Sequence, residues 1–225
     1  MAVLAATDLA DLRRRRFDAL YTGAVTDVLD RLGFLRQTLP RELAPLRPGM
    51  RLAGPAYPIR GRAREGADYH VTIRKVLEML GSVPPGHVAV YETNDSASAH
   101  LGELSVTSLK SRGCAGAVID GGCRDVDFIL REEFPVFARY TTPQDCTVRW
   151  ELVAHGDETA TIGGVDVRPG DYVVADLDGI VVVPREVVDE VLAEAEAKVA
   201  TESEIRSAVR GGMLPLAAYE RFGTF

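Results

Sequence analysis

Two short glycine-bearing segments carry most of the residues that could do chemistry. They are residues 100–104 (HLGEL) and residues 121–125 (GGCRD). The arginine of the second segment, Arg124, can bind a carboxylate or an enolate oxygen through its planar fork. Its neighbour Asp125 can bind a hard divalent cation through oxygen. Taken alone, the pair is explained equally well by a surface arginine beside a helix-capping aspartate.

The spacing of the two segments makes the pair more informative. Twenty residues lie between Glu103 and Arg124, which is enough for one helix and one strand. One such step would return both turns to the same sheet edge, where ligands bind in open α/β folds. Helix N-termini there add backbone N–H groups that favour anions. We expect a crevice for an anionic α-keto acid, lined by Glu103, Arg124, Asp125 and the N–H groups of Leu104 and Ser105.

The elements that position these turns alternate between strand and helix. This alternation predicts an α/β fold with a parallel or mixed sheet. Glycines at 33 and 81 are expected to end two of the upstream helices. The expected helices are 8–20, 26–32, 70–80, 104–112 and about 126–133, and the expected strands are 51–59, 87–91, 115–120 and about 135–139.

The pattern changes after residue 147. Short β segments separated by Gly, Pro and Asp turns lead into a long helix, which Gly211 and Gly212 should end. The sequence shows no internal repeat and no flexible linker. It therefore predicts a single domain over residues 1–225, with a C-terminal helical arm at about 186–210.

The composition narrows the class of protein. The chain has 225 residues with 46% hydrophobic residues and a net charge of -7, which argues against a nucleic-acid partner. The basic run 13–16 is expected to be the solvated face of a helix. No apolar run approaches the roughly 18 residues that a membrane span needs, and the N-terminal charges follow the apolar stretch, unlike a secretory signal. Three cysteines without a C-x-x-C pair fit a reduced compartment, so we expect a soluble cytoplasmic protein.

The segment 102–127 (GELSVTSLKSRGCAGAVIDGGCRDVD) resembles the RraA-like superfamily, whose pattern is an acidic residue, 20 residues and then Arg-Asp. That superfamily includes class II 4-hydroxy-4-methyl-2-oxoglutarate/4-carboxy-4-hydroxy-2-oxoadipate aldolases, oxaloacetate decarboxylases and the regulator of ribonuclease E activity. The similarity extends to residues 22–33, 54–61, 84–92 and 167–184. One departure is Glu103, which stands where the pattern most often has aspartate.

The resemblance implies a divalent-metal-dependent lyase that cleaves a C–C bond beside a pyruvyl group. It implies that Asp125 binds Mg²⁺ or Mn²⁺ directly and that Glu103 holds the water ligands of the metal. Arg124 would contact the keto oxygen and stabilise the enolate. The substrate carboxylate would be bound at the turn formed by Gly102, Leu104 and Ser105. Retro-aldol cleavage and oxaloacetate decarboxylation share this enolate, so one site could catalyse both.

The resemblance also implies how the chain assembles. Family aldolases bring an acidic residue from the C-terminal helix of a neighbouring subunit, and Glu202 or Glu204 could fill that role here. The spacing of Glu202 and Arg206 favours Glu202. The implied architecture is an αββα sandwich akin to the swivelling phosphohistidine domain, assembled as a homotrimer or homohexamer with sites between subunits. The alternative function is that of a non-catalytic, protein-binding regulator resembling the ribonuclease E regulator.

Several other residues have simpler explanations than a role in catalysis. Asp176 and Asp178 are more typical of a β-turn than of a second metal site. The four histidines lack the spacing of a zinc site. His100 lies beside the crevice, where a substrate contact is possible but a structural role is favoured. Cys123 could have a lowered pKa beside Arg124, although packing under the turn is the preferred interpretation.

Overall fold

A nine-stranded sheet forms the centre of the computed structural model, which describes residues 6–225. Its hydrogen-bonded order is β1-β6-β5-β3-β2-β10-β11, with β4 paired to β5 and β7 paired to β2. Strands β2, β3, β5 and β6 run parallel to one another. The strands are β1 (Ala44–Pro45), β2 (Leu52–Ala63), β3 (Val88–Glu92), β4 (Ala99–Leu101), β5 (Gly116–Cys123), β6 (Val136–Thr141), β7 (Trp150–His155), β10 (Tyr172–Asp176) and β11 (Gly179–Val183), and a separate hairpin joins β8 (Ala160–Ile162) to β9 (Val165–Val167).

Seven helices are described around this sheet. Two of them, α4 and α5, connect the parallel strands that lead to the candidate site. The helices are α1 (Ala6–Asp18), α2 (Thr22–Arg31), α3 (Tyr69–Ser82), α4 (Glu103–Ser111), α5 (Val126–Arg131), α6 (Val188–Arg210) and α7 (Pro215–Phe222). The predicted α/β class is therefore confirmed.

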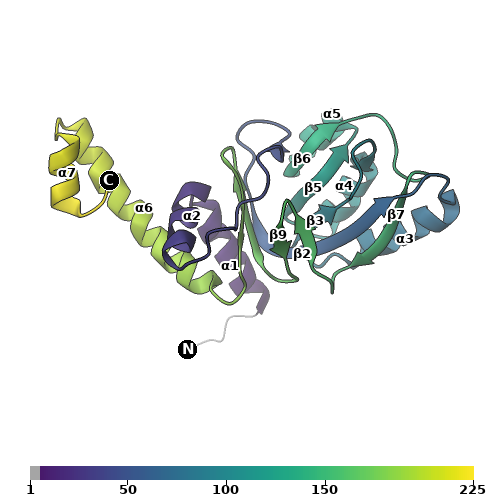
Figure 1. Cartoon of the computed structure of the whole chain (residues 1–225), viewed down its shortest axis with the longest axis horizontal. Helices are drawn as coiled ribbons and strands as arrows, with labels where there is room; N and C mark the ends of the chain where they lie inside the picture. Colours follow the sequence, from purple (N-terminus) through teal and green to yellow (C-terminus); the bar gives the residue numbers. More distant parts are fainter. Residues whose placement is uncertain (1–5) are drawn as a thin grey trace.

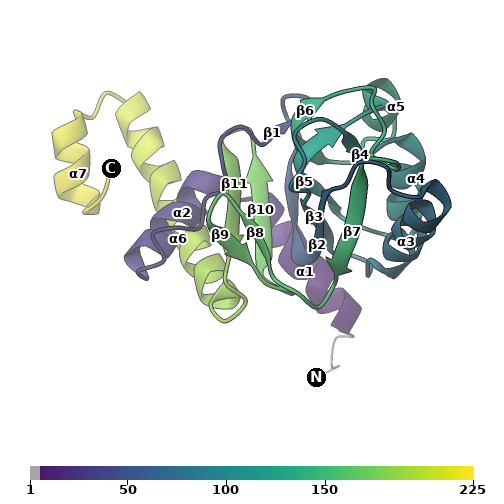
Figure 2. The same cartoon turned by 45° about the vertical axis from the view of Figure 1, so that its right-hand side comes forward.

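Strands β3, β10 and β11 are buried on both faces, which explains their nearly continuous valine-rich runs. In β3, Val88 and Val90 face an interior that they share with β10 and β11, while Ala89 and Tyr91 face α3 and α4. Helices α1, α2 and α6 pack on the outer face of β10 and β11. Figure 2 shows these layers, with β10 and β11 lying between α2 and α6 on one side and the parallel strands β2, β3, β5 and β6 on the other.

The parallel strands and the pair β10–β11 belong to one sheet that curls around the interior between them. The sheet is therefore nearly closed, like a barrel. Strand β2 makes this possible because it is 12 residues long and pairs with β10, β3 and β7 in turn. These contacts do not test the likeness to the swivelling phosphohistidine domain, which stays a prediction.

Two predicted helix boundaries were wrong for identifiable reasons. Gly81 lies inside α3, which continues to Ser82. The helix ends there because Val83 has an extended backbone, the conformation favoured for a residue that precedes proline. Helix α2 starts at Thr22, four residues earlier than expected. The buried carboxylate of Asp176 accepts hydrogen bonds from the Thr22 amide and hydroxyl at 2.8 and 2.7 Å. This contact with a residue distant in sequence fixes the start of the helix.

The long C-terminal helix α6 forms an arm that runs away from the sheet, and α7 folds back against it (Figure 1). The first half of α6 packs against α2, with Val191, Leu192 and Ala195 fully buried. The basic run of α1 is not wholly solvated, because Arg13 and Arg16 pair with Asp189 and Glu196 on α6. The predicted arm is thus present and is held at its base by both apolar and charged contacts.

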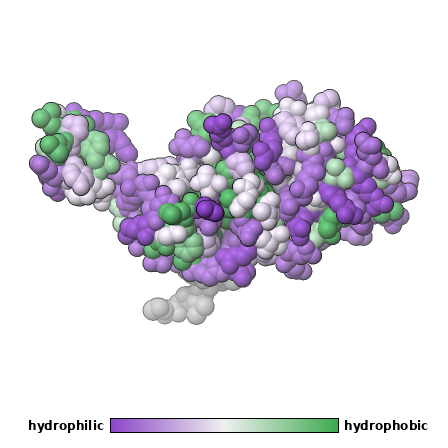
Figure 3. All heavy atoms as spheres, in the orientation of Figure 1, coloured by the Kyte–Doolittle hydropathy of each residue, from purple (hydrophilic) through white to green (hydrophobic). Residues whose placement is uncertain are grey.

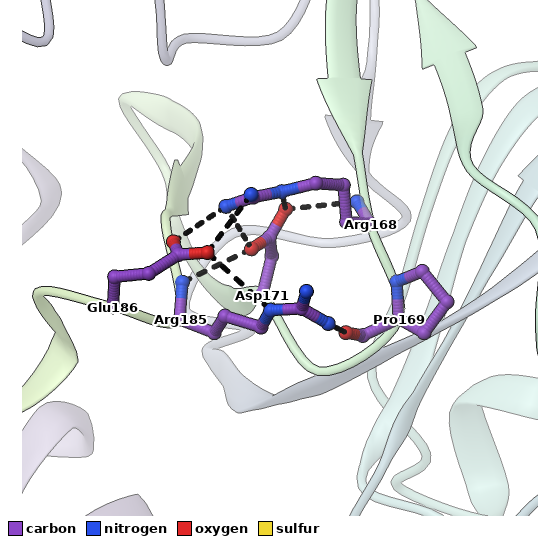
Figure 4. Close-up of polar contacts among 5 residues, drawn as sticks. All are labelled: Arg168, Pro169, Asp171, Arg185 and Glu186. Atoms are coloured by element: carbon purple, nitrogen blue, oxygen red, sulfur yellow. Dashed lines mark hydrogen bonds and ion pairs between the residues drawn. The ribbon is translucent and has the colours of Figure 1, made fainter.

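An ion-pair network around one buried carboxylate fixes the point where the arm leaves the sheet (Figure 4). The Asp171 carboxylate, 2% exposed, accepts hydrogen bonds from three nitrogens of Arg168 and from the Arg185 amide. Arg168 also donates to Glu186 at 2.6 and 2.9 Å, and this contact lowers the pKa of Glu186 to about 2. The network joins the turn before β10 to the segment that leads into α6.

Within residues 6–225, no helix is both long enough and apolar enough to cross a bilayer. Residues 1–5, on which the prediction about a secretory signal partly rests, lie outside the described residues.

Candidate active site

The two glycine-bearing turns leave the sheet side by side because the strands before them are paired. Strand β4 runs parallel to β5, with Leu101 opposite Cys123. The Arg124 amide donates to the Leu101 carbonyl at 2.9 Å and ties the second turn to the first. Since the carboxyl ends of parallel strands meet at one sheet edge, residues 102–103 and 124–125 converge there, as their spacing predicted.

Asp125 starts α5 with its carboxylate turned toward the first turn of α4. Its backbone is left-handed, with φ of 57°, a conformation that aspartate adopts more readily than most residues but that still costs energy. Its Oδ2 atom accepts a hydrogen bond from the Glu103 amide at 3.2 Å, and its side chain is 42% exposed. The carboxylate is therefore fixed in direction and still accessible to a ligand.

The first turn of α4 presents backbone donors at the same place. Gly102 is the N-cap residue in an extended conformation, and the helix begins with the Val106 amide donating to the Gly102 carbonyl at 3.0 Å. The amides of Leu104 and Ser105 belong to this first turn, whose N–H groups have no acceptor within the helix. A helix N-terminus of this kind favours an anion, which suits the carboxylate of a keto acid.

The Arg124 side chain lies between two carboxylates without a short contact to either. Its Nε atom is 3.6 Å from Asp125 Oδ2, and its Nη1 atom is 3.9 Å from Asp145 Oδ1. The side chain is 38% exposed. A guanidinium placed in this way can still offer its N–H groups to an oxygen of a bound ligand.

A cleft of about 350 Å³ opens over these turns. This volume is typical of sites for small molecules. Its polar side is formed by Glu103, Arg124, Asp125 and Asp145, and its apolar side by α3. A cavity of similar size, about 360 Å³, lies between α1 and α6, where the Arg16–Glu196 ion pair already balances its charges.

Gly102 is required by the close packing of the two turns. A Cβ atom at this position would lie 2.6 Å from Asp125 Oδ2 and 3.2 Å from Arg124 Cγ. The glycines of the second segment, Gly121 and Gly122, lie inside β5. Side chains there would meet Thr93 at 2.6 Å and Tyr140 at 2.4 Å, so these glycines serve packing within the sheet.

The acidic groups at the cleft suit a hard divalent cation better than a softer metal that prefers thiolate or imidazole ligands. Asp125 and Glu103 offer carboxylate oxygens, which Mg²⁺ and Mn²⁺ prefer. Among the described residues, no group of three or more His, Cys, Asp or Glu side chains could enclose a metal ion. Mg²⁺ is commonly held by one or two carboxylates together with water and substrate, so the residues present fit such an ion.

His100 is buried beside the cleft, and burial lowers its pKa to about 4, so the ring is neutral near pH 7. Its Nε2 atom is 3.3 Å from Oδ2 of the buried Asp95, and its ring packs edge-on against Trp150. Within the described part of the chain, neither ring nitrogen finds a hydrogen-bond partner of good geometry. These contacts agree with the structural role that the sequence favoured, and a substrate contact stays untested.

Glu202 and Glu204 do not reach this cleft within one chain. Both lie on α6, and Glu202 pairs with Lys198 at 3.2 Å. Figure 1 shows the arm on the opposite side of the molecule from α3 and α4, which flank the cleft. A contribution from a neighbouring subunit therefore stays a prediction.

The structure decides between the alternatives left open for Cys123 and for Asp176 and Asp178. Burial, with a smaller effect of the Asp125 charge, raises the pKa of the Cys123 thiol to about 11, so the lowered pKa was wrong and the side chain packs under the turn. Asp176 and Asp178 form the turn between β10 and β11, where the Asp178 amide donates to the Asp176 carboxylate at 3.0 Å. The turn interpretation is confirmed.

Two acidic residues near the site were missed from the sequence. Asp145 and Asp95 belong to irregular segments without a periodic pattern. Long-range contacts bring Asp145 to the cleft and Asp95 to His100 beside it. The Ala99 amide donates to the Gln144 carbonyl at 2.8 Å, and this hydrogen bond places Asp145 beside β4.

Comparisons with known proteins agree with this geometry. A relative from Halalkalibacterium halodurans named "Putative 4-hydroxy-4-methyl-2-oxoglutarate aldolase" is 28% identical over 205 residues, 91% of each chain. An uncharacterized protein from Pseudomonas syringae superposes with a TM-score of 0.81 at 28% identity, covering 93% of this chain and 97% of that one. Streptomyces coelicolor RraAS2, of the RNase ES inhibitor RraA family, gives 0.77 at 28% identity, covering 88% and 98%. The RraA-like family model, described as Aldolase/RraA, matches residues 22–182, and the chain belongs to this family.

Proposed function

We propose that the protein is a divalent-metal-dependent lyase that cleaves a carbon–carbon bond beside a pyruvyl group. The observation that carries the proposal is the pairing of the two turns, in which the Glu103 amide donates to the Asp125 carboxylate and Arg124 lies alongside. The pairing gathers an oxygen ligand for a cation, a guanidinium and helix N–H groups at one cleft. These are the groups that an enolate-forming reaction needs.

The residues have distinct roles in this proposal. The amides of Leu104 and Ser105 bind the substrate carboxylate at the positive end of α4. Arg124 donates to the keto oxygen, and its charge offsets the negative charge that develops there as the bond breaks. Asp125 would hold the cation directly and Glu103 through its water ligands, and the cation supplies Lewis-acid polarisation of the same keto oxygen when it is bound.

Proton transfer completes the reaction. In retro-aldol cleavage of a 4-hydroxy-2-oxo acid, the hydroxyl proton leaves, the C3–C4 bond breaks, and C3 of the pyruvate enolate later takes a proton. Glu103, half-buried at the start of α4, is the carboxylate placed to accept the hydroxyl proton directly or through water. Oxaloacetate decarboxylation releases CO₂ and leaves the same enolate, so the same residues serve both reactions.

We further propose that the arm completes the site of a neighbouring copy in a homotrimer or homohexamer, with Glu202 as the contributed acid. Apolar side chains at the free end of the arm support this assembly, since exposed apolar patches commonly mark protein contacts. Figure 3 shows hydrophobic residues gathered there. The exposed residues are Leu214, Leu216, Tyr219 and Phe225.

The test is pyruvate release from oxaloacetate and from 4-hydroxy-4-methyl-2-oxoglutarate, with Mg²⁺ or Mn²⁺ and again with EDTA. We expect turnover that EDTA abolishes and that added metal restores. Turnover that ignores EDTA contradicts the metal-dependent mechanism. Folded protein that cleaves neither these nor other 2-oxo acids would favour the alternative, a protein-binding regulator like the one named for the S. coelicolor neighbour.

A further inference from the structure

One face of α3 forms an apolar wall opposite the charged turns. Its residues are spaced three, four and seven positions apart, which places them on one side of the helix. Leu77 is 59% exposed and Tyr69 is 50% exposed, although both line the same cleft as Arg124 and Asp125. The wall consists of Tyr69, Ile73, Val76, Leu77 and Leu80.

The charges of the cleft limit how many carboxylates a substrate can carry. Among the described residues that line it, Arg124 is the one arginine or lysine, and it faces the carboxylates of Glu103, Asp125 and Asp145. A bound dication would bring this set to neutrality, so one substrate carboxylate can rest on the N–H groups of α4 and no unpaired cation of this chain remains for a second. A second carboxylate would lie against the apolar wall with no cation to pair with, which is unfavourable.

Building on the proposed function, we infer that the substrate is a 2-oxo acid with a single carboxylate and an apolar substituent on the carbon that leaves. In retro-aldol cleavage the C3–C4 bond breaks, its electron pair forms the pyruvate enolate, and C4 becomes the carbonyl carbon of an apolar aldehyde or ketone. The α3 wall binds the substituent on C4, while Arg124 and the α4 amides bind the pyruvyl half. The cleft of about 350 Å³ has room for both halves of a small substrate.

The test compares two substrates in the full-length, metal-loaded protein. One is 4-hydroxy-2-oxo-4-phenylbutanoate, with one carboxylate and a phenyl group, and the other is the dicarboxylate 4-hydroxy-4-methyl-2-oxoglutarate. We expect kcat/KM to favour the phenyl compound by about tenfold or more, a discrimination that hydrophobic pockets commonly reach. This comparison uses the wild-type chain, so it decides the inference without any variant.

Two arginine variants test whether the α3 wall causes the substrate preference. Leu77→Arg should shift the kcat/KM ratio at least tenfold toward the dicarboxylate, because it supplies a cation for the second carboxylate. Val71→Arg is the matched control, since Val71 is 55% exposed on the same helix but lines a different cavity. It should leave the ratio unchanged.

The outcomes separate this inference from the proposed function. Faster cleavage of the dicarboxylate by the wild-type protein overturns the inference and leaves the lyase function standing. If folded protein cleaves neither compound but still decarboxylates oxaloacetate, the inference is wrong and the lyase function stands; failure with all three substrates overturns both. If Leu77→Arg alters the oligomeric mass while the substrate ratio stays constant, the wall is a contact between copies of the chain and the inference is wrong.

Discussion

Replacing Gly102 by alanine should move the two residues that define the site without unfolding the protein. The added Cβ atom would lie 2.6 Å from Asp125 Oδ2, and 3.2 and 3.3 Å from Cγ and Nε of Arg124. An ordinary contact needs about 3.4 Å or more, so the carboxylate must retreat by about 0.8 Å. The Gly102 backbone has φ of -139°, which alanine adopts without strain, so the effect is confined to this contact.

The size of the expected effect follows from that displacement. A catalytic group displaced by about 1 Å can cost on the order of 100-fold in rate. We expect kcat for pyruvate release to fall by about that factor in Gly102→Ala. The free energy of unfolding should change little, because the Asp125 side chain is 42% exposed and can swing toward solvent.

Gly81→Ala is the matched control. Gly81 lies inside α3 and has nothing within 4 Å of a Cβ position, so alanine should raise stability by about 0.5–1 kcal/mol and leave kcat unchanged. The assay is steady-state pyruvate release for both variants, together with urea unfolding. Wild-type kcat in Gly102→Ala would show that close packing at Gly102 does not position Asp125 and Arg124 for catalysis.

Three further predictions test other parts of the molecule. Asp171→Ala should lower the free energy of unfolding by about 2 kcal/mol, because it removes the buried carboxylate that accepts hydrogen bonds from the partly exposed Arg168 and from the Arg185 amide, and urea denaturation would show it. The pKa of His100 is lowered to about 4, so the unfolded chain binds more protons below pH 6.5. Stability should therefore fall by about 2 kcal/mol from pH 7 to pH 5, and this slope should be lost in His100→Gln; an unchanged slope would contradict it. If Glu202 serves a neighbouring site, inactive Glu202→Gln and Asp125→Asn chains should regain activity when co-assembled, whereas no recovery in mixed oligomers would place Glu202 outside the site.

The parts of the fold that the sequence predicted are those set by local pattern. The valine-rich runs in β3, β5, β10 and β11 are strands because their side chains are buried on both faces. The turn at Arg124 and Asp125 was predictable because it follows such a strand. Its meeting with Glu103 was predictable because parallel strands share one edge.

The features that escaped prediction depend on contacts between distant segments. Strand β4 has only three residues, and it exists through pairing with β5 and a bond to Gln144. The glycines at 121 and 122 looked like a flexible loop because the side chains that pack on them, Thr93 and Tyr140, are 18 or more positions away. The exposed face of α3 was predicted as helix, but nothing in its sequence shows that it faces Arg124.

Binding of Mn²⁺ to the purified protein, measured by electron paramagnetic resonance with and without pyruvate, shows whether the paired turns hold a cation beside a keto acid. We expect Mn²⁺ to bind the wild-type chain and pyruvate to tighten the binding. Asp125→Asn should lose this binding, while Asp127→Asn, at an exposed acid two positions away, should keep it. If Mn²⁺ still binds Asp125→Asn with the same response to pyruvate, Asp125 is not the metal ligand and the proposed site is wrong.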